Sequence, residues 1–482
     1  MLRTFFVLLL ALGLPALASA QGDAVREDKI PITSASEEAR GLYIEARDMA
    51  EKLRARDARP VYDQAIAADP TFALAYYGRA LAAATNADFF ANLEKAMANV
   101  DEASEGEQLL IRALDAGVRG EPDEQLQLLQ QLVETHPNDE RAHNALAGAY
   151  IGRQEYEKAI AEFERATEID PEYSSSYNNL GYAQRAVGNY AAAEEAFKRY
   201  IELIPDDPNP HDSYAELLMK MGRHDESIAE YRAALAADPE FTFSYVGIAT
   251  NQMLMGQGDA ARTTLQELYD KAPDSGVRRQ ALINKATSYL HEGNIDAAMA
   301  ALGEAHAIAE GESDWLAVSG DHQLMGDVQL FAGNADEAAA HYAQALESGE
   351  KADVPEGVKA GIRKNDHFNK ARVALAKGDV AAAETGAAAY HEVAGAPFEV
   401  WQDHELMGRI ALAKGDAATA LTHFEASNQQ NPEVLYAIAE AQKAAGDAAA
   451  AREAAERAAN FNQLGFAYGY IRPMAQAMVS GS

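Results

Sequence analysis

Asp-His dipeptides recur three times in the second half of the chain, at Asp321-His322, Asp366-His367 and Asp403-His404. His143 and His211 occupy the corresponding place in earlier segments. Carboxylate and imidazole groups are metal ligands, so a metal site is one interpretation. Neighbouring helix residues point about 100° apart, however, and packed helices lie roughly 8–10 Å apart, whereas a metal needs its ligands near 2 Å. The pattern therefore favours repeat packing, and we expect no bound metal.

Other chemistry-bearing motifs are missing from the sequence. It contains no cysteine, no Gly-rich phosphate loop, no His-Glu-x-x-His and no Gly-x-Ser-x-Gly. Its carboxylates are scattered among lysines and arginines, as on solvated helix faces. We therefore predict a protein that is not an enzyme and has no cofactor.

A regular spacing of prolines reveals the elements on which these residues lie. Pro137, Pro171, Pro205, Pro239 and Pro273 stand 34 residues apart. The same apolar sites recur ahead of them, as in Ala159, Phe163 and Ala166. Offsets of three and four place such residues on one helical face, and a following proline ends the helix. A period of 34 residues is typical of a helix-turn-helix repeat.

Glycines mark the turn inside each predicted helix pair, at Gly188, Gly222, Gly256, Gly293, Gly333, Gly378, Gly415 and Gly446. Glycine accepts the left-handed conformation that closes a helix, and an Asp or Asn after it can cap the next helix. From Gly256 onward the intervals are 37, 40, 45, 37 and 31 residues. Because insertions that preserve a repeat usually lie in loops, we expect longer linkers in the later repeats.

These features, together with Tyr177-Asn178-Asn179-Leu180-Gly181-Tyr182 and the segment 212–218, resemble the tetratricopeptide repeat family over roughly residues 39–465. The central block also looks like exported bacterial members of that family. The resemblance implies an all-α fold, a right-handed superhelical solenoid of about eleven or twelve stacked helix-turn-helix repeats. It also implies binding of an extended peptide in the groove that the first helix of each pair lines.

Aligning the sequence with the repeat pattern of the family implies which residues face the groove. The first set is mostly polar: Arg141, Asn144, Ser175, Asn178, Tyr182, Arg185, Asn209, Asp212, Glu216 and Met219. Chaperone-binding members hold a terminal carboxylate with Lys, Arg and Asn, but Asp212 and Glu216 intrude here and argue against that clamp. The next repeats present an apolar run, Phe243, Val246, Thr250, Met253, Ile283 and Leu290. This run is either an anchor for a partner's side chains or a surface that a neighbouring helix or loop covers.

The N-terminus predicts export. Residues 1–20 contain Arg3, an apolar run and then Ala18-Ser19-Ala20, which is typical of a secretory signal cleaved before Gln21. The apolar run is shorter than the roughly 20 residues of a membrane span, so we expect no integral span after cleavage. Residues 21–38 are predicted as a flexible leader, with Ser34 and Glu37 forming a capping box.

The rest of the chain is expected to divide into three parts. Residues 39–350 form the N-terminal and central solenoid, and residues 351–465 form C-terminal repeats after a hinge near residues 347–364, where glycine and proline gather. Residues 466–482 end an apolar, aromatic stretch that begins near Phe461. A solenoid must cover its last repeat, so this end is predicted to be a cap rather than a docking tail.

The formal net charge of -34 bears on the partner. It argues against nucleic acid and anionic lipid and favours a cationic peptide or protein, unless it serves only solubility. We therefore predict an exported interaction scaffold, in the periplasm or secreted. The alternatives are a periplasmic protein that binds a small molecule or glycan, and a structural subunit of a cell-envelope complex.

Overall fold

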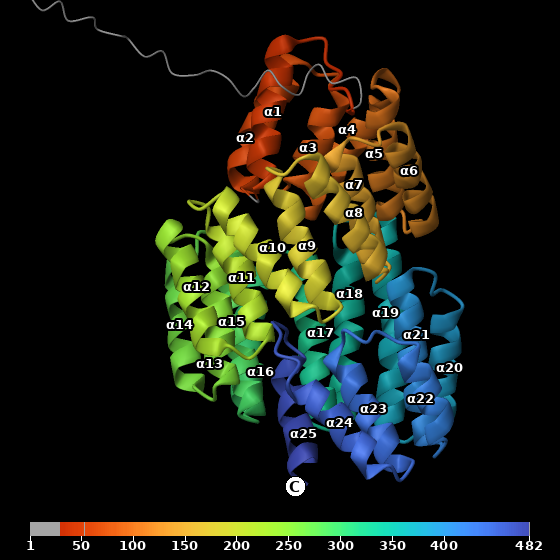
Figure 1. The fold of residues 1–482 in the computed structure, drawn as a ribbon. Helices are drawn as coiled ribbons and strands as arrows, with labels where there is room; N and C mark the ends of the chain where they lie inside the picture. The colour runs from red at the N-terminus through yellow and green to blue at the C-terminus, as the bar shows by residue number, and fades with distance from the viewer. Residues whose placement is uncertain (1–28, 53, 482) are drawn as a thin grey trace, which may run out of the picture. The chain divides into compact units, whose positions relative to one another are not determined.

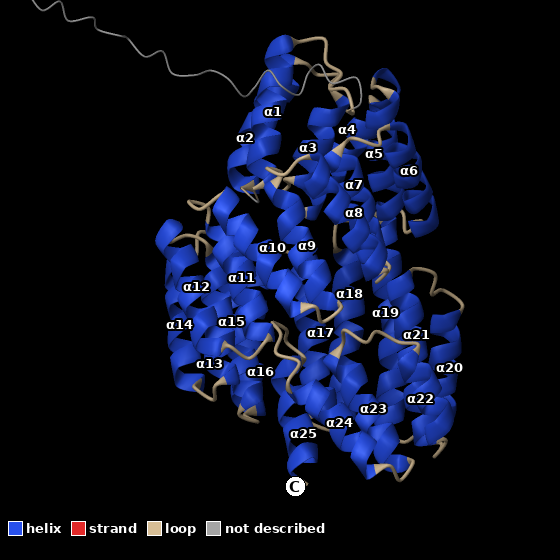
Figure 2. Ribbon diagram, viewed as in Figure 1, coloured by secondary structure: helices blue, strands red, loops and turns tan. Residues whose placement is uncertain are grey.

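The computed structural model describes residues 29–52 and 54–481, and in these residues the chain forms twenty-five α-helices, one short 3-10 helix and no β-strand (Figure 2). The all-α prediction is confirmed. The predicted signal, residues 1–20, lies outside the described residues. Among the described helices, none has the length and apolar content needed to cross a bilayer.

The helices follow one another as twelve pairs, and a last helix, α25 (Tyr468–Ser480), follows the twelfth pair (Figure 1). The first helices of the pairs are α1 (Glu37–Glu51), α3 (Ala73–Leu81), α5 (Glu105–Val118), α7 (Glu140–Gly152), α9 (Ser174–Ala186), α11 (Pro208–Lys220), α13 (Thr242–Leu254), α15 (Ser275–His291), α17 (Trp315–Phe331), α19 (Glu356–Ala376), α21 (Pro397–Ala413) and α23 (Pro432–Ala444). The second helices are α2 (Ala55–Ala68), α4 (Asn86–Ala98), α6 (Pro122–Thr135), α8 (Tyr156–Ile169), α10 (Tyr190–Leu203), α12 (His224–Ala237), α14 (Gly258–Lys271), α16 (Ile295–Gly311), α18 (Ala335–Lys351), α20 (Val380–His391), α22 (Ala417–Glu425) and α24 (Ala448–Ala459).

The predicted apolar face of the second helices is buried. Ala159, Phe163 and Ala166 of α8 are at most 2% exposed, and the equivalent residues of α10, α12 and α14 are buried too. The first helix contributes a small residue opposite the large one. A Cβ added to Gly181 would lie 2.6 Å from the Phe197 ring, so only glycine allows this approach of the two helices. Side-chain size at these two positions therefore sets the spacing within the pair.

The turns also follow the predicted pattern. All eight turn glycines have positive φ angles, between 72° and 86°. Where a capping residue follows, Asn294 accepts a hydrogen bond from the Ala297 N–H, and Asp416 accepts one from the Thr419 N–H. Asn189 makes no such cap, because its amide donates back to the Gln184 side chain instead. Capping by the residue after glycine is therefore confirmed only in part.

The expectation of longer linkers holds only late in the chain. The connections after α20 and α22 have five and six residues, against four after α8, α10 and α12, whereas those after α14 and α16 have three. The four helices α15 to α18 have 17 residues each and α19 has 21, whereas α7 to α14 have 13 or 14. The extra residues add about one helical turn, in which every added backbone group finds a partner within the helix. The segment 347–364, predicted as a hinge, is mostly helical, with the end of α18 and the start of α19 separated only by residues 352–355.

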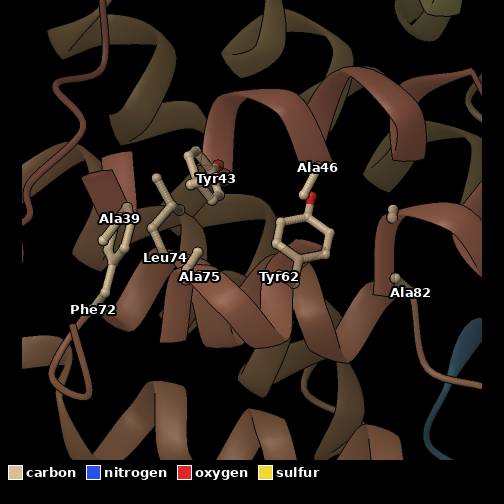
Figure 3. Close-up of a cluster of buried hydrophobic side chains, with 10 residues drawn as sticks. Ala39, Tyr43, Ala46, Tyr62, Phe72, Leu74, Ala75 and Ala82 are labelled. Carbon is tan, nitrogen blue, oxygen red and sulfur yellow. The ribbon is translucent and has the colours of Figure 1, made fainter. Parts of the chain in front are cut away.

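The chain divides into two compact units. Unit 1 contains the described residues up to Arg112 together with Gln131–Ala142. Its core lies between α1, α2 and α3, where the Tyr43 ring lies 5.2 Å from Phe72 and 6.0 Å from Tyr62 between centroids (Figure 3). Small alanines surround these rings and let the helices approach closely.

The segment ahead of α1 is bound to unit 1. The backbone N–H of Ile30 donates to Asp139, and that of Thr33 donates to Glu107. The predicted capping box of Ser34 and Glu37 is wrong, because the Ser34 hydroxyl donates to Asp69, 2.6 Å away. The residue that caps α1 is Ser36, whose side chain accepts from the Ala39 N–H.

Unit 2 contains Ala113–Gln130 and the chain from His143 onward. In unit 2, turns that are far apart in the sequence are joined by hydrogen bonds. The Gln154 side chain, in the turn between α7 and α8, donates to Asn428 in the connection between α22 and α23, and Gln430 donates to the carbonyl of Ala186. Helix α25 lies against α23 and α24 and also against α15. The C-terminal helix therefore packs on the last pair and on a first helix from the middle of the chain.

Candidate ligand-binding cavity on the first helices

A cavity of about 650 Å³ lies within unit 2. The first helices α7, α9 and α11 form one wall, and the connection between α24 and α25 forms another. The lining residues with polar or aromatic groups include Asn144, Asn179, Tyr182, Arg185, Glu216, Lys220, Gln430 and Phe461. We call this space the first cavity.

A simple count from the turn glycines places the side chains of the first-helix wall. Tyr182 and Arg185 lie six and three residues before Gly188, and Glu216 and Met219 lie at the same distances before Gly222. Such positions share one helical face. Gly181, seven residues before the turn glycine Gly188, packs against the second helix of its pair. Tyr182, the next residue, points about 100° away from that contact and faces the first cavity.

Polar contacts hold this wall in place. The Asn179 amide donates to the Asn144 side-chain oxygen over 3.0 Å, and Arg185 Nη1 donates to Glu216 over 3.1 Å. The Arg185 guanidinium also lies over the Tyr182 ring, 4.6 Å from its centroid. Two amides, an aromatic ring and an ion pair are thus held by their neighbours before any ligand enters.

Lys220 is a lining residue that sequence analysis missed. Its ammonium lies 3.1 Å from the centroid of the Phe461 ring. Burial, together with the positive charge of Arg185, lowers the pKa of Lys220 to about 7. A weakly held proton makes this amine responsive to a ligand that brings a hydrogen-bond acceptor or a negative charge. Lys220 falls 34 residues after Ala186, which also lines the first cavity, so the repeat period itself was a usable signal.

The C-terminal wall is fixed by Tyr468. Its hydroxyl donates to the Ala459 carbonyl over 2.7 Å and accepts from the Asn462 N–H over 3.0 Å. Asn462 has a φ angle of 46°, in the left-handed region that asparagine tolerates better than most residues. This bend carries residues 461–464 along the first cavity.

Five residues of the predicted first set do not line the first cavity: Arg141, Ser175, Asn178, Asn209 and Asp212. Arg141 belongs to unit 1, where its guanidinium binds Glu51 with Nε and Oε1 2.7 Å apart. Asn178 is buried, and its side-chain oxygen has no hydrogen-bond partner in the described part of the chain. Asp212 is also buried and accepts a hydrogen bond from Ser244 over 2.6 Å; burial raises the pKa of Asp212 to about 7. Asn209 is buried and donates to the Tyr200 hydroxyl over 2.9 Å. The three buried residues belong to the packing between repeats.

The predicted apolar run is mostly covered. Val246 and Met253 lie in a buried cluster with residues of α14. Leu290 is 1% exposed, and Ile283 packs against the same cluster, which includes Tyr470 and Ile471 of α25. Phe243, in contrast, is 60% exposed. A neighbouring helix therefore covers the C-terminal half of the run.

Four of the five histidines in the Asp-His pattern, all but His367, contact the second helix of their own pair. His143 and His211 meet Glu162 and Glu230, each 19 residues later. His322 and His404 meet histidines at the same offset, with Nδ1 atoms 3.2 Å and 3.1 Å apart. No group of three or more metal-ligating side chains with suitable geometry occurs among residues 29–52 and 54–481.

Paired helices around an inner cavity define a helical-repeat protein. Comparison with known families gives the repeat type. Residues 147–188 match a family described as TPR repeat, and residues 184–246 and 218–286 match the tetratricopeptide repeat. This part of the chain therefore carries tetratricopeptide repeats, as the resemblance implied.

Individual relatives match over short stretches. Superkiller complex protein 3 of mouse is 25% identical over 103 residues, which cover 21% of this chain and 7% of that protein. A heat-shock protein cognate co-chaperone, sgt12 of Aspergillus fumigatus, is 31% identical over 98 residues, which cover 20% of this chain and 29% of that protein. The chain thus spans less than a third of the length of these relatives.

A solved structure of a tetratricopeptide repeat protein from Parabacteroides merdae is also similar. It is 16% identical in sequence and covers 57% of this chain and 94% of its own, with a TM-score of 0.37.

Proposed function

We propose that this protein is an exported, non-enzymatic interaction scaffold that binds an extended segment of a peptide or protein in the first cavity. The observation that carries the proposal is the lining itself. Amide groups of Asn144 and Asn179 can pair with the donors and acceptors of a peptide backbone, and Tyr182 and Phe461 offer apolar area to its side chains. Tetratricopeptide repeats at residues 147–286 and the similarity to a co-chaperone support the same class of function.

Charge refines the proposed partner. The charged lining of the first cavity is Arg185, Glu216 and Lys220, so the acidity of the whole chain is not concentrated there. We expect the net charge of -34 to steer a cationic partner toward the surface, and a neutral stretch of that partner to enter the first cavity. The Lys220 amine then donates to a backbone carbonyl of that stretch.

Peptide selection tests the binding site. Peptides of twelve random residues are selected on the full chain, and the affinity of the best binders is measured by fluorescence anisotropy. The double variant Asn144→Ala and Asn179→Ala should weaken binding about tenfold or more, because two preorganised amides are lost. Gln127→Ala with Gln131→Ala removes two exposed amides from α6 and serves as the matched control. Equal loss in both double variants, or no loss in either, would place the binding surface elsewhere.

Export is tested separately. Residues 1–28 fused to alkaline phosphatase, which is active only outside the cytoplasm, should give an active enzyme in a bacterial host. Charged substitutions in the apolar run, such as Leu8→Arg with Leu10→Arg, should abolish that activity. Activity that survives these substitutions would refute the signal.

A further inference from the structure

A second cavity, of about 420 Å³, lies among the C-terminal repeats of unit 2. Its walls are four consecutive first helices, α17, α19, α21 and α23, with α22 and the C-terminal helix α25 (Figure 1). The first cavity has none of these six helices in its walls. The two spaces therefore belong to different repeats and have different linings.

The residues that line the second cavity stand at the same distances from the turn glycines as those of the first cavity. The residues six before the glycines are Asp327, Arg372, Arg409 and Glu440, counted from Gly333, Gly378, Gly415 and Gly446. They hold the register that Tyr182 and Glu216 hold in the first cavity. In four consecutive repeats, the residue at this position is therefore charged and faces the second cavity.

Three of these four charges are held in ion pairs. Arg372 Nη1 donates to Asp327 Oδ1 over 2.7 Å, and Arg409 Nη2 lies 2.8 Å from Glu405 Oε1. Each guanidinium thus has its own carboxylate. The remaining acids on the wall, Glu433 and Glu440, are left without an ion-pair partner among the described residues.

The surroundings of these two acids differ. Glu433 accepts a hydrogen bond from the Tyr470 hydroxyl over 2.7 Å, whereas the Glu440 carboxylate has no hydrogen-bond partner in the described part of the chain. Burial raises the pKa of Glu440, although Arg409 and Lys443 act in the opposite direction. Burial together with the charge of Glu405 raises the pKa of Glu433 against the opposing charges of Arg372 and Arg409. A positive charge placed beside them would relieve this unfavourable environment.

The rest of the second cavity is apolar. Leu375 and Leu412 lie three residues before their turn glycines, and Phe331 and Met474 add to the same space. The Phe331 ring stacks on the Tyr470 ring, with centroids 4.8 Å apart and planes inclined by 23°. Such a wall suits a flat or aliphatic group.

We propose that the second cavity binds a small organic cation, an ammonium group joined to an aliphatic or aromatic body, with the ammonium beside Glu440 and the body along Leu375 and Leu412. The excess of carboxylates selects the positive charge, and the apolar wall excludes strongly hydrated ions. The volume accommodates one molecule of modest size. This site is separate from the peptide-binding cavity and does not depend on it.

The experiment uses the full chain and 4-phenylbutylamine, with 4-phenylbutanol as the uncharged analogue, in isothermal titration calorimetry at pH 7.5. The amine should bind saturably with one site, and the alcohol should bind about tenfold or more weakly. Glu440→Gln should weaken binding of the amine by at least about tenfold and leave the alcohol unchanged. Glu453→Gln, on the exposed face of α24, is the matched control and should change neither.

Equal affinity for the amine and the alcohol in the unmodified chain would overturn the proposal, as would the absence of saturable amine binding. Unchanged binding by Glu440→Gln would overturn it as well. A second variant, Leu375→Trp, fills the space and should weaken binding of both compounds. The double variant Asn144→Ala and Asn179→Ala should bind the amine normally, so the failure of either site is seen independently of the other.

Discussion

The repeats from α7 to α14 and those from α15 to α24 build the same helix pair in two ways. The earlier pairs have helices of 13 or 14 residues, and their second helices lack a side-chain cap wherever a capping residue is described. The later pairs reach 17 residues or more in α15 to α19, and Asn or Asp caps α16, α20, α22 and α24. Register is retained although helix length is not, because the contact between the small residue and the second helix recurs in both regions.

This difference teaches that the inward positions are independent of the packing ones. Six residues before the turn glycine, the first cavity has Tyr182 and Glu216, whereas the second has Asp327, Arg372, Arg409 and Glu440. Three residues before it, the first has Arg185 and Met219, whereas the second has Leu375 and Leu412. The helix contacts of the pair stay the same in both. A repeat can therefore change its ligand without changing its fold.

The largest expected effect tests whether the two regions are equally packed. Phe197 and Phe424 are each 0% exposed and occupy equivalent positions, in α10 and α22. Replacing either by alanine should lower the free energy of unfolding by about 3–5 kcal/mol, through lost burial and the space left behind. Urea unfolding followed by circular dichroism measures the change. A loss below about 1 kcal/mol in one variant only would show that its region relaxes around the gap, and the two packings would then differ.

Asp212 sharpens the comparison within the earlier repeats. Burial raises the pKa of Asp212 in the folded chain to about 7, from an ordinary value of 3.8. The folded chain therefore holds a proton that the unfolded chain releases, and stability is lost as the pH rises from about 4 to 7. Asp212→Asn retains the acceptor for Ser244 and should be more stable than the unmodified chain by about 4 kcal/mol at pH 8, with little difference at pH 4. Urea unfolding of both chains at pH 4 and pH 8 measures the difference in the free energy of unfolding. An equal difference at the two pH values would exclude the Asp212 carboxyl group as the cause.

His291 tests the later repeats with the opposite sign. Its ring lies 6.3 Å from Tyr468 of α25, and burial together with Arg472 lowers its pKa to about 4 from 6.5. The unfolded chain then binds the proton first, so stability is lost as the pH falls below 6.5. His291→Gln should reduce that loss by about 1–2 kcal/mol at pH 5 and change little at pH 8. Hydrogen exchange of α25 at the two pH values locates the effect, and unaltered exchange at pH 5 would contradict it.

The smallest effect concerns the caps. Asp416→Ala removes the acceptor of the Thr419 N–H and should lower the free energy of unfolding by about 1 kcal/mol. Asn189→Ala, at the equivalent turn of the earlier repeats, should change it by less than about 0.5 kcal/mol, since no cap is lost. Thermal unfolding of both variants gives the comparison. Equal losses would mean that the side-chain cap does not distinguish the two regions.

Much of the fold could be predicted from the sequence, because the repeat signals are local. The spacing of Ala159, Phe163 and Ala166 and the turn glycines depend only on helical geometry and on the left-handed conformation. Helix length was not predictable from the glycine intervals, because extra residues can enter a helix or a loop without breaking the pattern.

The candidate site could be predicted only in part. Register placed Asn144, Tyr182, Arg185 and Glu216 on the wall of the first cavity. It gave no sign that α25 would cover Leu290, because that contact joins residues far apart in the sequence. Glu440 was within reach of the same register, counted back from Gly446, but carboxylates on helices usually face solvent.

The hydrogen bonds from Gln154 to Asn428 and from Gln430 to Ala186 have a mechanical consequence. An open array of repeats lengthens under tension like a spring, because each unit is tied only to its neighbours. Here a clasp joins turns some 270 residues apart. Unit 2 should therefore resist extension at first, and these two hydrogen bonds must break before the repeats can move apart.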